Sequence, residues 1–449
     1  MHTVLTARGN ESVRRFAAFA STRRARVFVR ALGHGRTLLL ACAALALTAC
    51  GGGGGGGSGS GVIPPFNSYT AVAVADLNGD GLPDVVTVYA YIAAAPPHPG
   101  YVAVYLQDAA NPGHFLPPST YPVGNDPAAV AVADLQGDGR PDIVTANAIL
   151  SANGAGDSTV SVLLQDAVHP GHYLPAVSYA TGPDPLSVAI GDLNGDGKPD
   201  LAVADSSGIS VLLQDAAGRF LPKSTIATGG GCASVAIADL DGDGMPDLLA
   251  TDAASVLVLR QNPGGGGSFA APVRYVAGQQ PLYAVAGDLD GDGKPDIAVA
   301  NLGSPSNLNA ASVSVLLQDP ARAGAFRAAI NYATQAASLA VAIADLNGDG
   351  WPDLAVANSG TLAGGCPPDC NSVDTGISVL LQDGVTPGHF AAAVNYGPTG
   401  SDFVTGVAVA DINGDGKPDL IVLQAGGVFI RLQDPLNPGQ FLAARSIAD

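Results

Sequence analysis

The chain has 449 residues, of which 47% are hydrophobic and only 6% are aromatic, with 59 glycines and 33 prolines. Its net charge of −19 argues against a protein that binds nucleic acid through the phosphates. Many turn residues and few bulky ones predict an all-β architecture built from short strands.

Residues 1–49 have the pattern of a bacterial lipoprotein signal peptide. Eight arginines between Arg8 and Arg36 precede an apolar run, which is shorter than the about 20 residues that a membrane span needs. The sequence LTAC at Leu47–Cys50 resembles a lipobox, which implies that Cys50 carries a lipid. An ordinary signal peptide is the alternative.

A linker rich in glycine and serine follows at residues 50–65, and its composition is typical of a flexible tether. We therefore expect a protein of the bacterial cell envelope that faces the periplasm or the exterior. It would touch the membrane only through the lipid on Cys50. A secreted protein is the alternative.

Residues 66–449 contain seven copies of an acidic loop of the form DLNGDGKPD, beginning at Asp76, Asp134, Asp192, Asp239, Asp288, Asp345 and Asp411. A strand of small residues such as AVAVADL precedes each loop, and one such as DLAVAN follows it. Two further strand-like segments, such as ISVLLQD and HYLPAVSY, keep the same phase. Four strands repeated seven times predict a seven-bladed β-propeller with four antiparallel strands per blade. A solenoid is the alternative, but it needs polar end units that we do not find.

The strand, the acidic loop and the next strand resemble FG-GAP/VCBS repeats, the blade type of the integrin α-chain propeller. The resemblance covers about residues 66–449 and implies a propeller that binds protein or glycan partners. The Phe-Gly and Gly-Ala-Pro tokens are mostly absent from this sequence. Partner binding of the integrin kind is therefore not expected.

The spacing of oxygen-bearing side chains in the loops predicts calcium sites. In the third copy, positions 1, 3, 5 and 9 are Asp192, Asn194, Asp196 and Asp200, and position 7, Lys198, offers its backbone carbonyl. A hard, all-oxygen ligand set suits Ca²⁺. The only glutamate is Glu11, and 23 aspartates stand in the seven loops.

Three alternatives to a calcium loop of this kind are an EF-hand, an RTX nonapeptide and a plain polar β-turn. An EF-hand needs a glutamate at position 12, where this loop has Val203. RTX nonapeptides have a different period, and plain polar β-turns without metal are the remaining alternative.

We predict up to seven calcium ions, one per blade. Asp241 and Asp290 replace the asparagine of position 3 and add charge, whereas Gln136 is expected to give the weakest site. The predicted ligands are Asp76, Asn78, Asp80, Leu82 and Asp84; Asp134, Gln136, Asp138, Arg140 and Asp142; Asp192, Asn194, Asp196, Lys198 and Asp200; Asp239, Asp241, Asp243, Met245 and Asp247; Asp288, Asp290, Asp292, Lys294 and Asp296; Asp345, Asn347, Asp349, Trp351 and Asp353; and Asp411, Asn413, Asp415, Lys417 and Asp419.

Connections on the opposite side of the propeller differ in length and chemistry, and variable loops on a rigid scaffold are where recognition usually resides. We predict a monomeric, calcium-binding adhesion or ligand-binding module for protein or glycan partners. A calcium-dependent carbohydrate-active enzyme and a purely structural envelope protein are the alternatives. Candidate contacts are Tyr91, Asn125, Asp126, Asp184, Tyr283 and Phe403.

No catalytic residue is predicted. Residues 50–449 lack glutamate, which excludes the usual glutamate-based glycosidase pairs. His114, His172 and His389 recur at one phase of the repeat, which indicates a structural role, and neither His98 nor His169 has a visible nucleophile partner.

The cysteines and the single tryptophan complete the candidates. Cys366 and Cys370 could form a disulfide, and metal binding by this pair is the alternative. Cys232 is expected to be a buried thiol. Trp351 lies inside an acidic loop, and we expect it to pack on that face and not to act as a sugar platform.

Overall fold

The computed structural model describes residues 67–91, 98–148, 158–304, 310–362, 372–373, 375–397 and 403–448. The predicted signal peptide, Cys50, the linker, and the pair Cys366 and Cys370 lie outside this part of the chain. Within it, no helix is both long enough and apolar enough to cross a membrane.

Seven four-stranded sheets follow one another along the chain, and each is one blade. Blades 1 to 3 are β1 (Asn67–Ala75), β2 (Asp84–Tyr91), β3 (Gly100–Tyr105) and β4 (Ser119–Val123); β5 (Pro127–Ala133), β6 (Asp142–Asn147), β7 (Thr159–Leu163) and β8 (Val177–Ala180); and β9 (Ser187–Gly191), β10 (Asp200–Asp205), β11 (Gly208–Leu212) and β12 (Ser224–Ile226). Blades 4 and 5 are β13 (Ser234–Ala238), β14 (Asp247–Thr251), β15 (Val256–Leu259) and β16 (Val273–Tyr275); and β17 (Pro281–Gly287), β18 (Asp296–Asn301), β19 (Ser312–Leu316) and β20 (Ile330–Ala333). Blades 6 and 7 are β21 (Ser338–Ala344), β22 (Asp353–Asn358), β25 (Gly376–Leu380) and β26 (Val394–Tyr396); and β27 (Val404–Ala410), β28 (Asp419–Gln424), β29 (Gly427–Arg431) and β30 (Arg445–Ser446). A short hairpin of β23 (Thr361–Leu362) and β24 (Ser372–Val373) extends from blade 6.

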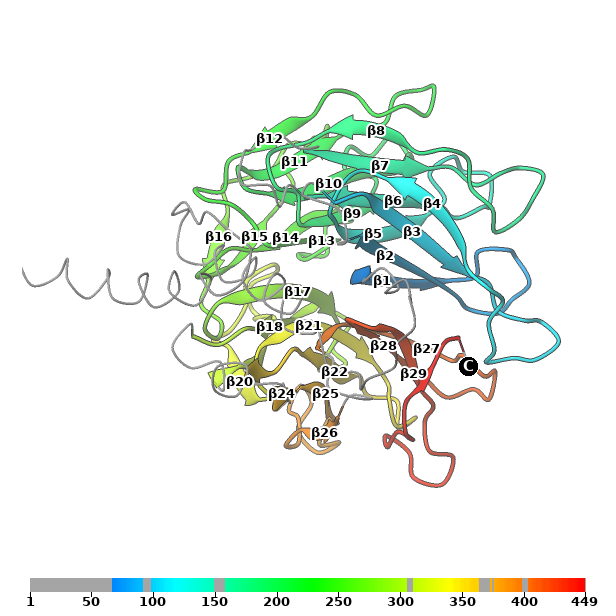
Figure 1. Ribbon diagram of the computed structural model, residues 1–449. Coiled ribbons are helices and arrows are strands. Elements are labelled where there is room, and N and C mark those ends of the chain that lie inside the picture. The colour runs from blue at the N-terminus through cyan, green and yellow to red at the C-terminus, as the bar shows by residue number, and fades with distance from the viewer. Residues whose placement is uncertain are drawn as a thin grey trace, which may run out of the picture.

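The blades are arranged in a ring, with the first strand of each blade nearest the centre (Figure 1). All neighbouring strands within a blade are antiparallel. The connections between strands 1 and 2 and between strands 3 and 4 therefore lie on one face, and the other connections lie on the opposite face. The prediction of a seven-bladed propeller with four antiparallel strands per blade is confirmed.

Burial explains the composition of each strand. The second strand is buried along its whole length, as in β10, where the apolar residues 201–204 stand between two aspartates. The inner strand β5 is only partly buried after its first residue and consists mainly of alanine and valine, since larger side chains would clash where blades crowd the axis. The outer strand β8 is mostly exposed.

The hydrophobic core is divided into seven clusters, each formed between two neighbouring blades. One cluster joins Val86 and Val102 of blade 1 to Ile143 and Leu163 of blade 2. Another joins Val85 of blade 1 to residues of blade 7 such as Ile421 and Ile430, and so closes the ring. Closure by side-chain packing excludes the open solenoid.

Candidate metal centres

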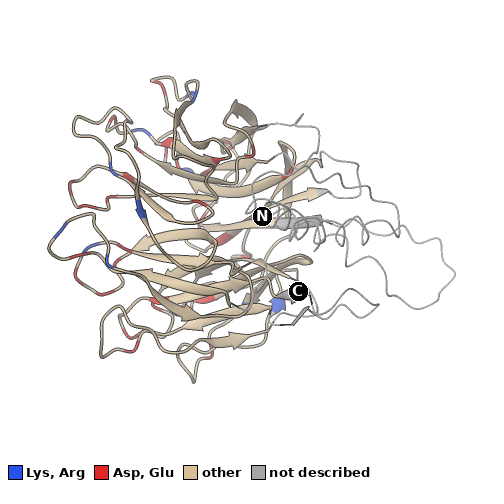
Figure 2. Ribbon diagram, turned by 90° about the vertical axis from the view of Figure 1, so that its left-hand side faces the viewer, with Lys and Arg blue, Asp and Glu red and all other residues tan. Residues whose placement is uncertain are grey.

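Each acidic loop is the hairpin connection between the first and second strands of a blade. In all seven blades the aspartate at position 9 pairs with the last residue of the inner strand, as Asp200 does with Gly191. The seven loops therefore share one register and lie on one face. Figure 2 shows most of the charged residues on loops at the left side of the ring.

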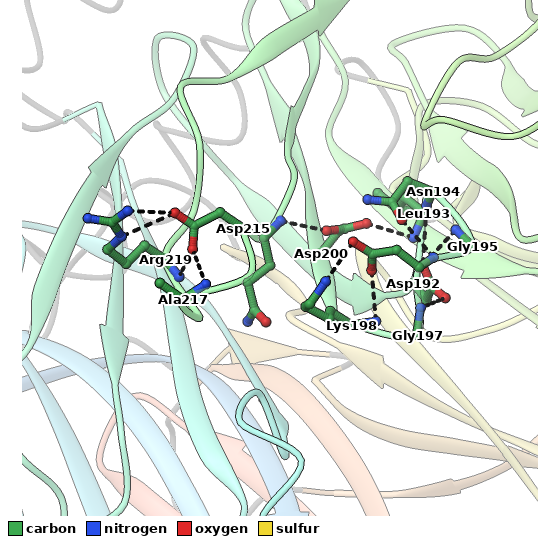
Figure 3. A network of polar contacts seen from close by, with 12 residues as sticks. Asp192, Leu193, Asn194, Gly195, Gly197, Lys198, Asp200, Asp215, Ala217 and Arg219 are labelled. Atoms are coloured by element: carbon green, nitrogen blue, oxygen red, sulfur yellow. Dashed lines mark hydrogen bonds and ion pairs between the residues drawn. The ribbon is translucent and has the colours of Figure 1, made fainter.

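The aspartate at position 1 shapes the loop. Asp192 accepts hydrogen bonds from the backbone N–H groups of Gly195 and Gly197, at 2.7 Å each, and from that of Asp196 at 3.1 Å (Figure 3). Both glycines have positive φ, +77° and +83°, a conformation that side chains with a Cβ rarely adopt. Glycine at these two positions therefore allows the chain to curl around Asp192.

The aspartate at position 9 ties the loop to the third strand of its blade. Asp200 is fully buried, and its two oxygens accept from the backbone N–H groups of Leu193 at 3.0 Å and Gln214 at 2.7 Å. Burial raises the pKa of Asp200 to about 6, against the lowering effect of these two hydrogen bonds. The same bonds and the same raised pKa recur at Asp84, Asp142, Asp247, Asp296, Asp353 and Asp419.

The aspartate at position 5 faces position 7. Asp196 accepts from the backbone N–H of Lys198 at 2.9 Å and pairs with its ammonium at 3.0 Å (Figure 3). The hydrogen bond from the Lys198 side chain lowers the pKa of Asp196. The backbone bond to position 7 recurs in the other six loops, at Leu82, Arg140, Met245, Lys294, Trp351 and Lys417.

Positions 1, 3 and 9 come together where all three are aspartates. In blade 4, Asp239, Asp241 and Asp247 each offer an oxygen within 4.8 Å of the others. Asp288, Asp290 and Asp296 do the same in blade 5, where burial and the charges of Asp292 and Asp288 raise the pKa of Asp290. The predicted ligand set is thus assembled in part, because position 5 is not a member of either cluster.

These two clusters fit a hard cation. Their donors are all oxygens, which Ca²⁺ prefers, and Oδ1 of Asp241 is buried without a hydrogen-bond partner. Such a buried polar atom is costly unless something satisfies it. In four other blades position 3 is an asparagine, whose side-chain oxygen accepts a hydrogen bond from the backbone N–H of position 5. These residues are Asn78, Asn194, Asn347 and Asn413.

Six of the seven loops also accept a hydrogen bond from the following blade. Gln165 of blade 2 donates from Nε2 to the carbonyl of Leu77, position 2 of the first loop, at 2.8 Å. Equivalent bonds join Gln214 to Leu135, Gln261 to Leu193, Gln318 to Leu240, Gln382 to Leu289 and Gln433 to Leu346. The loops are therefore part of the interfaces that hold the ring together.

Sequence profiles of the FG-GAP-like repeat match residues 89–145, 148–203, 192–250, 239–299 and 368–422, and those of the FG-GAP repeat match 68–105, 284–316 and 338–368. The chain belongs to the FG-GAP-like repeat family. No curated protein sequence matches it significantly.

Solved structures agree with this FG-GAP propeller in fold. One is an Agrocybe aegerita lectin described as recognising non-reducing terminal N-acetylglucosamine, with 19% identity, a TM-score of 0.52, and coverage of 84% of this chain and 93% of that chain. Another is a candidate 6-phosphogluconolactonase from Bacteroides uniformis, with 16% identity, a TM-score of 0.53, and coverage of 80% and 94%. At these identities the likeness concerns the fold alone, and the neighbours include both a binding protein and a candidate enzyme.

The tryptophan of the FG-GAP propeller packs on the acidic face. A Cβ placed on Gly291, in the loop of blade 5, would lie 2.7 Å from ring atom Cζ3 of Trp351, which belongs to the loop of blade 6. Trp351 thus packs across two neighbouring loops, as expected for a residue that is part of this face.

The candidate contacts on the variable face differ in how far they are exposed. Tyr283 is 39% exposed. Asp126 and Phe403 are only 3% and 7% exposed, so neither side chain is available for contact with a partner. Asp184 has a φ of +50° and lies in the connection that leads into blade 3. Asn125 is half-buried beside Asp126, and the side chain of Tyr91 lies outside the described part.

Sequence reasoning missed a pair of residues on this face. Nδ1 of His98 lies 2.8 Å from Oδ1 of Asp126, and the side chains are 13% and 1% exposed. They come from different blade connections, and no short-range motif joins them. The only signal was their placement on variable loops. Cys232 is a buried free thiol, as predicted.

Proposed function

We propose that this FG-GAP propeller binds calcium in its acidic loops, at up to one ion per blade. The observation that carries the proposal is the approach of the Asp239, Asp241 and Asp247 oxygens within 4.8 Å of one another, repeated in blade 5. A bound ion would neutralise carboxylates that otherwise repel one another. Positions 1, 3 and 9 would hold it, and its contribution there is structural.

Calcium in these loops would stabilise the blade interfaces. Extracellular calcium modules typically have dissociation constants of about 10⁻⁴–10⁻³ M. At about 1 mM calcium, each site then contributes roughly 0.4–1.5 kcal/mol to the free energy of unfolding. Several sites together would raise the melting temperature strongly.

Thermal unfolding with and without a chelator tests this. We expect chelation to lower the melting temperature, and calcium to restore it better than magnesium at equal concentration. The variant Asp290→Asn should weaken the effect of calcium on the melting temperature without abolishing it, because four other loops carry asparagine at that position. An identical melting curve in chelator and in calcium would contradict the proposal.

We further propose that the face opposite the acidic loops binds a protein or glycan partner. The contrast between the faces supports this: one repeats the same loop seven times, whereas the connections on the other differ from blade to blade. Tyr283 on the inner strand β17 is the first candidate contact, because the residue is 39% exposed, although burial raises the pKa of its hydroxyl. The lectin among the structural neighbours, described as recognising non-reducing terminal N-acetylglucosamine, supports the glycan alternative.

Glycan and protein arrays probed with and without calcium test the binding proposal. A positive signal should weaken in Tyr283→Ala and persist in Val385→Ala. Val385 is 87% exposed and lies in the connection between β25 and β26, on the acidic face. Equal loss in both variants would place the binding surface elsewhere.

The site of action we propose is the bacterial envelope, with Cys50 carrying the lipid. The sequence LTAC and the tether of residues 50–65 support it. Fractionation of cells that express the full chain or its Cys50→Ser variant tests the anchor. We expect the first in the membrane fraction and the second in the soluble fraction, and equal distribution would contradict lipidation.

A carbohydrate-active enzyme is the second candidate, and the pair His98 and Asp126 favours it. A histidine held at Nδ1 by a buried carboxylate is a common general base. Product formation on polysaccharide panels would be expected, with loss in His98→Ala. Absence of any product across the panel, with binding intact, would leave the binding function.

A further inference from the structure

Arg260 occupies a place that holds leucine in every other blade. The residue before the conserved glutamine is Leu106, Leu164, Leu213, Leu317, Leu381 or Leu432 in the other six. Leu317 packs under a turn of the next blade, where a Cβ on Gly388 would lie 2.7 Å from its Cδ2. Arg260 has the same position under Gly324, where a Cβ on the glycine would lie 3.2 Å from Cδ of Arg260.

The side chain of Arg260 points to the acidic cluster of blade 4. Its Nη1 lies 3.4 Å from Oδ2 of Asp241, whose side chain is 15% exposed. The other oxygen of Asp241 is buried and has no hydrogen-bond partner. Arg260 therefore places a positive charge next to one of three carboxylates that converge in this loop.

Blade 5 supplies the comparison. It has the same three converging carboxylates, with Asp290 in the place of Asp241, but Leu317 in the place of Arg260. Among the described residues, no lysine or arginine nitrogen lies within 4.0 Å of Asp290. Arg327 acts on it only from farther away. The two clusters thus differ in the guanidinium beside the position 3 carboxylate, while blade 5 also carries Lys294, paired with Asp292, where blade 4 has Met245.

We propose that Arg260 competes with the metal ion for Asp241 and so lowers the calcium affinity of blade 4. The inference rests on the proposed calcium binding. A dication that enters the cluster is repelled by the guanidinium and must also replace the ion pair. Partly exposed ion pairs are weak, so we expect Arg260 to reduce affinity about three- to tenfold. The added charge of Asp241 is then largely cancelled, unlike that of Asp290.

A reciprocal exchange tests the proposal. The chelator-treated protein is compared with Arg260→Leu, which installs the residue of the other six blades, and with Leu317→Arg, which introduces the cation into blade 5. Calcium bound per chain is measured by equilibrium dialysis over a range of free calcium, and enthalpy by calorimetric titration. Arg260→Gln is a second variant that removes the charge and keeps a polar side chain.

We expect Arg260→Leu and Arg260→Gln to shift one site per chain about three- to tenfold toward lower calcium, and Leu317→Arg to shift one site the other way. In an Asp241→Asn background the effect of Arg260→Leu should shrink, because the carboxylate that Arg260 neutralises is gone. The difference between Arg260→Leu and the parent should also shrink at high salt, which screens the guanidinium charge.

Unchanged isotherms in both Arg260 variants, with calcium still bound by the parent protein, would overturn the role of Arg260 alone. An equal shift in the Asp241→Asn background would overturn it too, because the effect would then be structural. No calcium binding by any form would overturn the proposed function and this inference together.

Discussion

Nε2 of Gln318 in blade 5 donates a 2.9 Å hydrogen bond to the carbonyl oxygen of Leu240, in the acidic loop of blade 4. The same nitrogen donates to Pro295 of its own blade at 3.0 Å. Gln318 is 3% exposed. One buried side chain therefore fixes a loop of its own blade and a loop of the preceding one.

The seam of the ring offers a control for this bond. Gln107 of blade 1 is 2% exposed and donates to Pro83 at 2.9 Å, but among the described contacts it makes no bond to Ile412 of blade 7. We predict that Gln318→Ala costs about 1 kcal/mol more unfolding free energy than Gln107→Ala. Denaturant titrations of both variants measure the difference, and equal losses would show that the inter-blade bond contributes little.

Gly388 tests how closely neighbouring blades approach. Its φ is +76°, and a Cβ there would lie 2.7 Å from Leu317 Cδ2 and 3.3 Å from Asp290 Cβ. Gly218 has the same φ with nothing within 4 Å of a Cβ. Gly388→Ala should therefore destabilise more than Gly218→Ala, by about 1–2 kcal/mol.

The Gly218 variant isolates the cost of the positive φ, and the difference between the two reports the contact. Calcium titration adds a second readout. Because Asp290 is the neighbour, Gly388→Ala should weaken calcium binding, whereas Gly218→Ala should not. Equal stability of the two variants would mean that blade 6 yields without strain.

The repeat made the fold predictable from the sequence. Seven copies in phase set the number of blades, and the alternation from small inner residues to buried runs such as Asp200–Asp205 set the strand order. The common register at position 9 follows from the constant length of the loop. Each of these features is local, so the sequence carries it directly.

Side-chain pairings, both within a loop and between distant segments, could not be predicted. The side chain of Asp196, a predicted calcium ligand, pairs with Lys198 two residues further along the chain. The pairs Arg260 with Asp241 and His98 with Asp126 join residues from different connections. Asp126 was expected at the surface because it lies in a loop, yet the contact with His98 accompanies its burial.

The buried aspartates predict an unusual pH dependence for the calcium-free protein. Burial raises the pKa of Asp353, and of its six equivalents at position 9, from 3.8 to about 6. The folded state then binds protons more tightly than the unfolded state, so this contribution is present below about pH 4 and is lost as the pH rises through about 6. In chelator, the melting temperature should fall by roughly 5–10 °C between about pH 4.5 and 7.

Calcium should reverse this slope. Metal binds the ionised carboxylates, so protonation at low pH would compete with it, and stability in calcium should rise with pH over the same range. Melting curves at several pH values, in chelator and in calcium, make the comparison. Parallel slopes in the two series would show that the position 9 aspartates do not sense the ion.

Trp351 provides an optical test of individual sites, because it is the only tryptophan in the chain. It lies at position 7 of the loop in blade 6 and contacts Gly291 in the loop of blade 5. Ion binding in either loop should change the surroundings of the ring. We predict a calcium-dependent change in tryptophan emission, and sensitised terbium luminescence when Tb³⁺ replaces calcium.

Variants assign the signal to a blade. Asp290→Asn should shift the fluorescence titration to higher calcium, because it removes a carboxylate next to Gly291, whereas Asp241→Asn in blade 4 should leave the titration unchanged. Trp351→Phe should abolish the signal and keep the calcium-dependent melting temperature. If Asp241→Asn shifted the signal as far as Asp290→Asn does, the emission would report a change of the whole ring and not the ions beside Trp351.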